Sequence, residues 1–331
     1  MKFIKDFLNS GTAKQQKNKR LGALLICITA AILVLALLVL AVFGIVGAIT
    51  KNRSEEEVAE DTTNQLPKGY VTTTFPKEWS VNGTMLEITA SQARAYSGTA
   101  PTVQPKQEVR EAAGALGLYR ADHGDIKLQQ ETMDAFHAMV KAFDAAKQGS
   151  SDYTANLLYL DSNLAPKSAT LSADTKEIIK SGTIVILSSQ PTTTDIGNET
   201  SIYDAENKTG VGVYKWFYDN AAKYGFIPVN QTAEEGNVFR YVGVAHASYM
   251  AKNKLNFSEY YQKLVNNTQP GKTLSVTVTG EDGKAIKYEM YYIAPTEQQL
   301  VPEKYAYTVS GDNAGGYIVT VNKSVQTDKQ A

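Results

Sequence analysis

The chain has 331 residues, of which 43% are apolar and 20% are charged, and its formal net charge at pH 7 is -1. This length and apolar fraction are sufficient for one or two domains, each with a buried core. The single cysteine, Cys27, excludes a scaffold that is held together by disulfides.

The N-terminal fifty residues show a strong charge asymmetry. Residues 1–20 carry six Lys or Arg residues against the single Asp6, whereas residues 21–50 contain no charged residue. At about 1.5 Å per residue, a helix of that length exceeds the roughly 30 Å of bilayer hydrocarbon. A cleaved signal peptide is the alternative, although its apolar region would span only about 7 to 15 residues. We therefore expect a transmembrane helix over 21–50 and a single-pass location in the cell membrane, with residues 1–20 cytoplasmic and the C-terminal domain extracellular.

Gly44 and Ala48 have the spacing that lets two membrane helices approach closely, which makes a dimer or a partner in a membrane complex an open alternative. Residues 51–68 are polar and acidic, and their composition is typical of a stalk. The range 51–105 is assigned to this stalk and an N-terminal extension, in which Tyr70 to Phe75 resembles a strand and Glu87 to Tyr96 is weakly helical.

The middle of the chain alternates helix and strand patterns. Apolar residues recur at spacings of three and four between Gln130 and Lys147, which predicts an amphipathic helix. The apolar run Leu157 to Leu160 predicts a buried strand. A helix is expected from Ala173 to Lys180 and another strand from Thr183 to Leu187.

Three stretches between residues 213 and 264 carry a family resemblance: Asn220 to Phe226, Phe239 to Gly243, and Leu255 to Tyr260. They resemble the core of the zinc D-alanyl-D-alanine carboxypeptidases of the VanY and peptidase M15 type. The resemblance implies an α+β domain over 106–265, in which helices cover an antiparallel sheet of the Hedgehog and DD-peptidase type.

The resemblance also implies a zinc site, in which two histidines and an aspartate bind the metal and a glutamate acts as general base. In this chain Asp204 is at the aspartate position and Glu235 is at the position of the base. The two histidine positions, however, are occupied by Gly197 and Val238.

Other features of the family's site are missing from their expected places. No arginine lies between Arg120 and Arg240, so the residue that the family uses to hold the substrate carboxylate is absent there. The three histidines of the chain are His123, His137 and His246, and a relocated zinc site would have to use these.

The C-terminal range 266–331 changes to the alternation that is typical of strands. One hairpin is predicted from Thr273 to Ile293 around a Gly280 to Gly283 turn, and a second from Tyr305 to Val321. This β extension is expected to follow the core or to add strands to its sheet.

From these observations we expect a cell-wall-facing carboxypeptidase-like protein that has lost its zinc and binds peptidoglycan stem peptides or serves as a scaffold. Arg240, Trp216 and Tyr241 are its candidate binding residues, and no cofactor and no nucleic-acid partner are expected. The alternative is an active zinc D,D-carboxypeptidase, in which Glu235 is catalytic and Asp204 binds the metal. A third hypothesis is a structural partner of a membrane complex that needs no cleft.

Overall fold

A computed structural model describes residues 66–104, 118–119, 121, 126–147, 156–160, 170–191, 200–280 and 282–327. The contacts within the chain divide it into two units, Met1–Gln65 and Leu66–Ala331. All of the described residues belong to the second unit.

Five α-helices lie in the described part of the chain: α3 (Gln130–Lys147), α5 (Ala173–Ile179), α6 (Lys215–Asn220), α7 (Val244–Asn253) and α8 (Phe257–Asn267). Four short 3-10 helices accompany them: η1 (Lys77–Val81), η2 (Gln92–Arg94), η4 (Gly212–Tyr214) and η5 (Ala221–Tyr224). Helix α8 has a capping box, because the Asn256 side chain accepts from the Glu259 amide while the Glu259 carboxylate accepts from the Asn256 amide. This reciprocal pair satisfies two backbone donors at the helix start.

The first sheet is antiparallel and has the strand order β2-β3-β8-β7, with β4 also paired to β3. Its strands are β2 (Asn156–Leu160), β3 (Ile184–Pro191), β4 (Thr200–Ser201), β7 (Phe226–Pro228) and β8 (Val238–Tyr241). Ile184 is paired with Arg240 and Ile186 with Val238, so these four side chains share one face of the sheet. Beside this sheet, β5 (Tyr203–Asp204) and β6 (Thr209–Gly210) form a small hairpin.

The second sheet has the order β12-β13-β10-β9 and is also antiparallel. Its strands are β9 (Leu274–Thr279), β10 (Ala285–Ile293), β12 (Tyr305–Gly311) and β13 (Tyr317–Gln326). A separate pair joins β1 (Tyr70–Thr72) to β11 (Leu300–Pro302), which links the first described strand to the C-terminal region.

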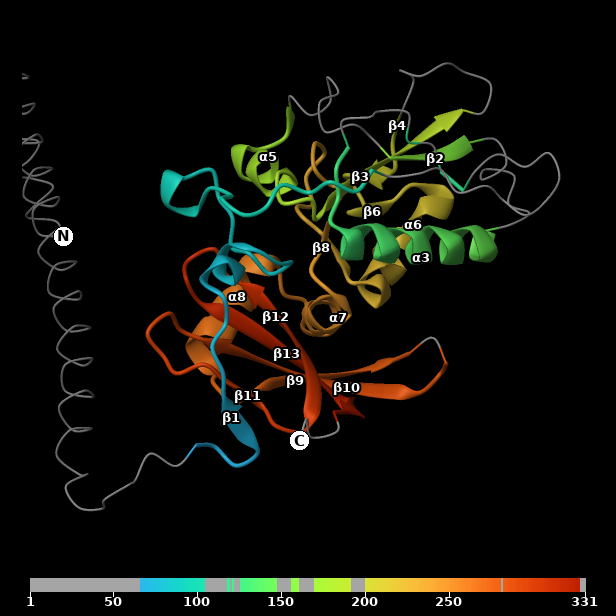
Figure 1. The fold of residues 1–331 in the computed structure, drawn as a ribbon. Helices are drawn as coiled ribbons and strands as arrows, with labels where there is room; N and C mark the ends of the chain where they lie inside the picture. Colours follow the sequence, from blue (N-terminus) through green and yellow to red (C-terminus); the bar gives the residue numbers. More distant parts are fainter. Residues whose placement is uncertain are drawn as a thin grey trace, which may run out of the picture. The chain divides into compact units, whose positions relative to one another are not determined.

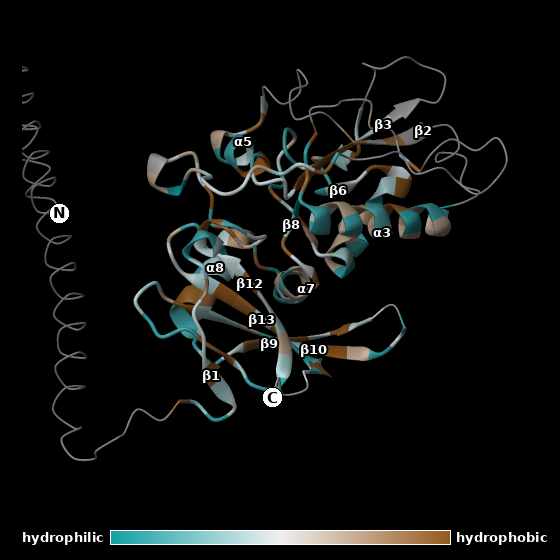
Figure 2. Cartoon of the chain, viewed as in Figure 1, coloured by the Kyte–Doolittle hydropathy of each residue, from teal (hydrophilic) through white to brown (hydrophobic). Residues whose placement is uncertain are grey.

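Apolar side chains cover both faces of the first sheet. One face packs on α3 and α6 through residues such as Leu158, Val185 and Phe239, whereas the other packs on α5 through Ile186 and Val238. Figure 2 shows α3 alternating between hydrophilic and hydrophobic residues along its length, as expected for a helix with one buried face.

The second sheet is covered in the same way. Met290 and Ile318 pack against α7 and α8, while Tyr291 and Val319 lie in a cluster with Phe75 from the N-terminal segment. Figure 1 shows α7 between the two sheets, and α7 contacts both β7 and β9. This helix therefore ties the second sheet to the core.

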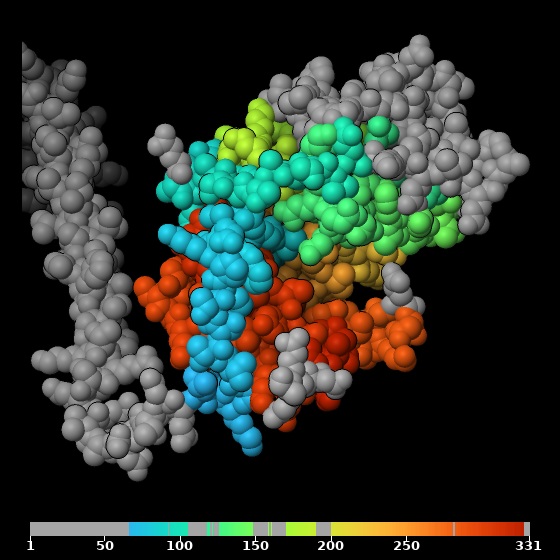
Figure 3. Space-filling view, in the orientation of Figure 1, coloured from blue at the N-terminus to red at the C-terminus, as the bar shows by residue number. Residues whose placement is uncertain are grey.

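The first part of the segment 66–104 runs over the strands of the second sheet, and Figure 3 shows it in blue along their outside, whereas its end pairs with Leu128 through Val103. Its backbone is bonded to the end of β12, where the Met85 amide donates to Ser310 Oγ at 2.9 Å and the Gly311 amide donates to the Asn82 carbonyl at 2.8 Å. A Cβ on Gly311 would lie 2.2 Å from the Ser80 carbonyl carbon, so only glycine permits this close approach.

Most of the predicted elements in this unit are confirmed. The amphipathic helix predicted from Gln130 to Lys147 is α3, and the two C-terminal hairpins form a sheet of their own rather than adding to the first sheet. The helix expected from Glu87 to Tyr96 was wrong except for η2. There the Glu87 amide donates to the Asp312 carbonyl, so a distant loop replaces a local helical partner.

The predicted membrane location is corrected by the structure. In the part of the chain that the structure describes, no helix is long and apolar enough to cross a membrane. Helix α3, with 18 residues, carries Glu131, Asp134 and Lys141, whose burial in hydrocarbon would be costly. The helix predicted over 21–50 lies outside the described residues.

Candidate functional site

The loop between β7 and β8 holds Glu235, the residue at the general-base position that the family resemblance implies. Its side chain is buried, with 3% of its surface exposed. Oε1 accepts a hydrogen bond of 2.6 Å from the Ser172 backbone amide, and Oε2 accepts from Asn230 Nδ2. The Glu235 amide donates to Thr232 Oγ1 at 3.2 Å, which closes the loop on itself.

These bonds make Glu235 an anchor for the start of helix α5. Ser172 is the N-cap of that helix, and its hydroxyl accepts from the Thr175 amide. Burial alone would raise the pKa of Glu235, but hydrogen bonds from Asn230, Ser172 and Thr175 outweigh it and lower the pKa below its ordinary value. The carboxylate is therefore ionised at neutral pH, and its negative charge lies beside a helix N-terminus that favours it.

Val238 stands where the resemblance would place a zinc-binding histidine. Its side chain is fully buried in an apolar cluster. The other buried members of this cluster are Leu86, Ile88, Leu171, Ile178, Ile184 and Ile186. The position is thus part of the packing between the first sheet and α5 and offers no ligand atom.

Two tyrosines hold the Glu235 loop from the other side. A Cβ on Gly236 would lie 2.0 Å from Tyr203 Cδ1, so the ring packs directly on the glycine backbone. Tyr218 donates its hydroxyl proton to the Gly236 carbonyl at 2.8 Å, and the centroids of the Tyr203 and Tyr218 rings are 5.6 Å apart. Burial raises the pKa of Tyr218, so its hydroxyl stays protonated and remains a donor.

Asp204, at the aspartate position of the resemblance, uses its carboxylate in its own hairpin turn. Oδ1 accepts from the backbone amides of Glu206 and Asn207, each at 3.0 Å, and Oδ2 accepts from Asn207 Nδ2 at 2.7 Å. The side-chain bond from Asn207 is the largest of the effects that lower the pKa of Asp204. This is the pattern of an Asx turn on the surface.

Arg240 is buried rather than presented to a ligand. Its guanidinium donates to the Leu86 and Thr84 carbonyls and stacks on the Phe257 ring, with Cζ 3.9 Å from the ring centroid. Burial lowers the pKa of Arg240 to about 9. In this arrangement Arg240 fastens the segment around Leu86 to β8.

The two aromatic residues predicted to bind a ligand differ in their surroundings. Trp216 packs on Phe143 and Tyr224 at the border of the α3 core, with ring centroids 5.6 and 6.0 Å away. Tyr241 packs on Phe226 and lines a hollow of about 380 Å³ at the start of α7, and burial raises its pKa to about 12. The structure does not bring either residue into hydrogen-bond contact with Glu235.

The histidines of the described residues lie within hydrogen-bond distance of neighbouring hydroxyl groups. His137 Nε2 lies 2.9 Å from the Tyr119 hydroxyl. His246 lies between the Tyr260 hydroxyl at Nδ1 and Thr320 Oγ1 at Nε2, each at 2.7 Å, and burial lowers its pKa to about 3. His123 and Gly197 lie outside the described residues.

The described residues do not fit the zinc centre that the resemblance implies. Among them, no group of three His, Cys, Asp or Glu side chains is placed to hold a metal ion. Val238 supplies no donor, and the oxygens of Glu235 and Asp204 already accept hydrogen bonds from neighbouring residues.

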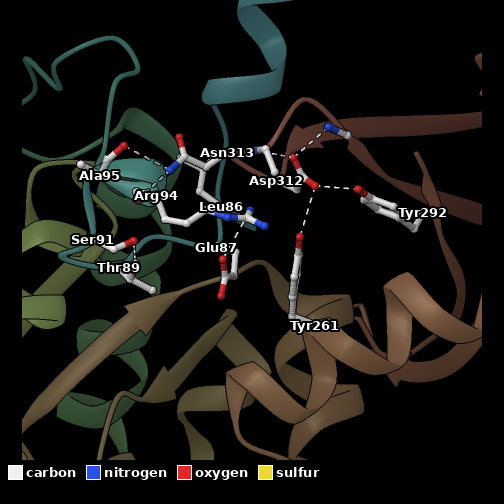
Figure 4. Close-up of polar contacts among 12 residues, drawn as sticks. Leu86, Glu87, Thr89, Ser91, Arg94, Ala95, Tyr261, Tyr292, Asp312 and Asn313 are labelled. Atoms are coloured by element: carbon white, nitrogen blue, oxygen red, sulfur yellow. Dashed lines mark hydrogen bonds and ion pairs between the residues drawn. The ribbon is translucent and has the colours of Figure 1, made fainter. Parts of the chain in front are cut away.

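A second buried carboxylate was not anticipated from the sequence. Asp312 has no exposed surface and accepts from four donors. The Tyr292 and Tyr261 hydroxyls lie 2.7 and 3.2 Å from Oδ2, while the Ala314 and Gly316 amides lie 2.7 and 2.8 Å from Oδ1. Figure 4 shows the two phenols pointing at the carboxylate.

Asn313, the residue after Asp312, connects the hydrogen bonds around Asp312 to the N-terminal segment. Asn313 donates from Nδ2 to the Arg94 carbonyl at 2.8 Å and to the Ala95 carbonyl at 3.2 Å (Figure 4). The Arg94 side chain forms an ion pair of 3.4 Å with Glu87. These contacts fix the segment 87–95 on the second sheet.

The sequence indicates the role of some residues in these hydrogen bonds but not of others. Ser172 directly precedes a predicted helix, so its capping role follows from a known preference. Asn230 and Asp312 lie in loops, where no periodicity reveals which distant donor or acceptor they meet.

Comparison with known proteins shows which proteins the chain is similar to. No protein-family model matches the chain. A D-alanyl-D-alanine carboxypeptidase of Enterococcus faecium is 38% identical over 117 residues, which cover 32% of this chain and 36% of that protein. The chain carries a D-alanyl-D-alanine carboxypeptidase-like domain. Because the match covers only about a third of the relative, the activity of the whole protein does not follow from it.

One solved structure agrees with this similarity in fold, and a second match is weaker. The vancomycin resistance D,D-dipeptidase VanXYg, solved with a D-Ala-D-Ala phosphinate analogue, has a TM-score of 0.52 and 17% identity, and the match covers 77% of this chain and 99% of that one. The LdcB LD-carboxypeptidase has a TM-score of 0.35 and 19% identity, with 51% and 82% of the two chains covered. The VanXYg match supports the α+β fold of the carboxypeptidase-like domain, and at this identity it supports the fold alone.

Proposed function

We propose that the protein binds peptidoglycan stem peptides that end in D-alanyl-D-alanine and does not hydrolyse them. The observation that carries this proposal is the bonding of Glu235. A general base must reach a water molecule, whereas the Glu235 side chain is only 3% exposed, and its two oxygens each accept a hydrogen bond, Oε1 from Ser172 and Oε2 from Asn230. Its lowered pKa also makes it a weaker base than an ordinary glutamate.

The neighbouring positions support the same function. Val238 is buried among apolar side chains, and Asp204 is bonded to its own turn. The stem-peptide ligand is inferred from the related proteins, since one is named for D-alanyl-D-alanine and VanXYg was solved with an analogue of D-Ala-D-Ala. We accordingly propose no cofactor for this binding function.

The experiment compares binding with hydrolysis in the purified full-length chain. The probe is Nα,Nε-diacetyl-L-Lys-D-Ala-D-Ala, whose binding is followed by calorimetry and whose hydrolysis is followed by the release of D-alanine. We expect binding without release, both before and after addition of zinc. Stoichiometric zinc in the unchelated protein together with D-alanine release would contradict the proposal.

A second candidate function is an active zinc D,D-carboxypeptidase that uses ligands from outside the described residues. The observation in its favour is the 38% identity to the Enterococcus faecium enzyme. This candidate requires Glu235 to act on the substrate, so Glu235→Gln would abolish D-alanine release while the neighbouring exposed Glu234→Gln would not. A wild-type protein without any release, or equal release from the Glu235→Gln protein, rejects it.

A further inference from the structure

The hollow of about 380 Å³ at the start of α7 is lined by residues from both sheets and from α3. Tyr241 at the end of β8 and the first residues of α7 line one side, and Glu131 in the first turn of α3 lines another. Glu235 and Val238 do not line it, so the hollow is separate from the catalytic position that the family resemblance implies. Its volume lies within the range of roughly 300–1,000 Å³ that is typical of small-ligand sites.

The wall from the second sheet carries hydroxyl groups on one face. Thr308 is paired with Thr320, and Thr320 with Met290, so these side chains share a face of the sheet. Tyr288 precedes Met290 by two residues and lies on the same face. Met290 is buried in the apolar cluster with α7 and α8, whereas Tyr288 is half-buried and Thr308 is exposed. The face therefore changes from apolar packing to hydroxyl groups where it reaches the hollow.

A buried histidine fixes one wall of the hollow without adding charge. His246 Nε2 lies 2.7 Å from Thr320 Oγ1, and its Nδ1 lies 2.7 Å from the Tyr260 hydroxyl. Burial lowers the pKa of His246 to about 3, so the ring is neutral at pH 7. No lysine or arginine is among the described residues that line the hollow. An anionic ligand would therefore find no cation to pair with.

Several polar groups of the hollow are not used by the fold. Those without a hydrogen-bond or ion-pair partner among the described residues are the hydroxyls of Thr84, Tyr241, Tyr288 and Thr308 and the carboxylate of Glu131. Gln129 also lines the hollow and donates from Nε2 to the Ser181 carbonyl at 2.8 Å, which leaves Oε1 as a further acceptor. Hydroxyls both donate and accept, whereas the carboxylate only accepts. The set complements a ligand with several neutral donors and acceptors.

Two tyrosine rings add apolar surface to these polar groups. Tyr241 and Tyr288 come from different sheets and both line the hollow. Burial is the largest of the causes that raise the pKa of each, so both hydroxyls stay protonated at neutral pH. A tyrosine presents an apolar ring and a polar tip to the same ligand. Saccharides match this combination, because a sugar ring has C–H faces and a rim of hydroxyl groups.

We propose that the hollow at the start of α7 binds a neutral saccharide. The C–H face of a sugar ring packs on Tyr288 and Tyr241. The sugar hydroxyls donate to the Glu131 carboxylate and to Gln129 Oε1, and they exchange hydrogen bonds with the Thr308 hydroxyl. This inference goes beyond the proposed function, since it assigns a second site on which stem-peptide binding does not depend.

The first test measures saccharide binding to the full-length chain by calorimetry. The probes are N,N′,N″-triacetylchitotriose and cellotriose, which are both uncharged and differ in their acetamido groups. Binding of either probe supports a saccharide site, and the ratio of the two affinities shows whether the acetamido group is recognised. A chain that binds neither probe overturns the inference.

The second test changes the tyrosine of the second sheet. We expect Tyr288→Ala to weaken saccharide binding about tenfold, because the ring contact and a hydrogen bond are both lost. Tyr288→Phe keeps the ring and should weaken binding only about threefold. The matched control is Tyr307→Ala, which removes an exposed tyrosine from the opposite face of the same sheet. It should bind as the wild type does, and unchanged thermal unfolding would show that the three variants are folded.

The third test uses a surface position, where folding is not at risk. Glu131 is exposed on α3, and Glu131→Gln replaces its charged acceptor by a neutral one. We expect saccharide binding to weaken about tenfold, because hydrogen bonds to a charged group are the stronger ones. Asp134→Asn is the control, since Asp134 is exposed on the same helix and does not line the hollow.

The outcomes separate this inference from the proposed function. Wild-type saccharide affinity in both Tyr288→Ala and Glu131→Gln places the sugar elsewhere and overturns the site. The Tyr288→Ala protein should still bind Nα,Nε-diacetyl-L-Lys-D-Ala-D-Ala, and a loss of peptide binding there without any saccharide binding would make the hollow a peptide site instead. A wild-type chain that binds the saccharide but not the peptide overturns the proposed function and supports this site.

Discussion

Glu235 and Asp312 are both buried carboxylates, with 3% and 0% of their surfaces exposed, but they belong to different parts of the domain. Asp312 lies in the loop between β12 and β13 and collects two amides and two phenols. Glu235 lies in the β7–β8 loop of the first sheet, where an amide at the start of α5 and the Asn230 side chain bond to it. One carboxylate organises the second sheet, and the other anchors a helix.

The two carboxylates make similar contacts, although only one of them is at a position that the family resemblance singles out. The resemblance assigned Glu235 to catalysis and gave no role to Asp312, yet both residues satisfy buried donors of the fold itself. For a buried carboxylate, the relevant question is whether its lone pairs are free for a substrate or a water molecule.

The largest effect is expected for Asp312→Ala. This change leaves two backbone amides and two buried phenols without their acceptor, and each unsatisfied donor costs about 1–3 kcal/mol. We expect the free energy of unfolding to fall by about 3 kcal/mol or more, measured by urea denaturation. The matched control is Asp282→Ala in the exposed turn before β10, which should stay close to wild type. An equal loss in both variants would contradict a structural role for the Asp312 cluster.

Glu235→Gln should have a smaller but clear effect. The glutamine side chain keeps one oxygen, which can accept from either Ser172 or Asn230. Its NH₂ group then faces the remaining donor. We expect a loss of about 1–2 kcal/mol in the free energy of unfolding, measured beside Glu234→Gln, an exposed neighbour. Wild-type stability in Glu235→Gln would show that the carboxylate is not an anchor for α5.

The third test is the pH dependence of the difference in unfolding free energy between the wild type and Glu235→Gln. The folded pKa of Glu235 is lowered, so its stabilising contribution is fully present above the unfolded pKa of about 4.3. The contribution is lost as the pH falls through the folded pKa. We therefore expect the gap in unfolding free energy between wild type and Glu235→Gln to be constant near pH 7 and to shrink below about pH 4. A gap that widens toward acid pH would mean that the folded pKa is raised instead.

The sequence predicted the elements whose patterns are local. The α3 periodicity and the alternation in the two C-terminal hairpins both reflect side chains that share one buried face. The pairing of β1 with β11 and the path of the chain at Met85 depend on partners more than 200 residues away. No local pattern carries that information.

In the candidate site, too, the sequence does not reveal contacts with distant parts of the chain. The resemblance located Glu235, Asp204 and Arg240, but their roles depend on neighbours that arrive from elsewhere in the chain. Arg240 bonds to the backbone near Leu86, which no charge pattern could reveal because its partners are carbonyl groups.

The smallest effect is expected for Asp204→Ala. Asp204 is a surface carboxylate whose hydrogen bonds come from its own turn, so its loss removes local bonds and leaves no buried donor unsatisfied. We expect only a slight shift of the urea midpoint and unchanged affinity for the diacetylated tripeptide. An active zinc enzyme that uses Asp204 as a ligand would instead lose its metal and its D-alanine release. Metal analysis of wild type and Asp204→Ala in parallel therefore separates a turn residue from a zinc ligand.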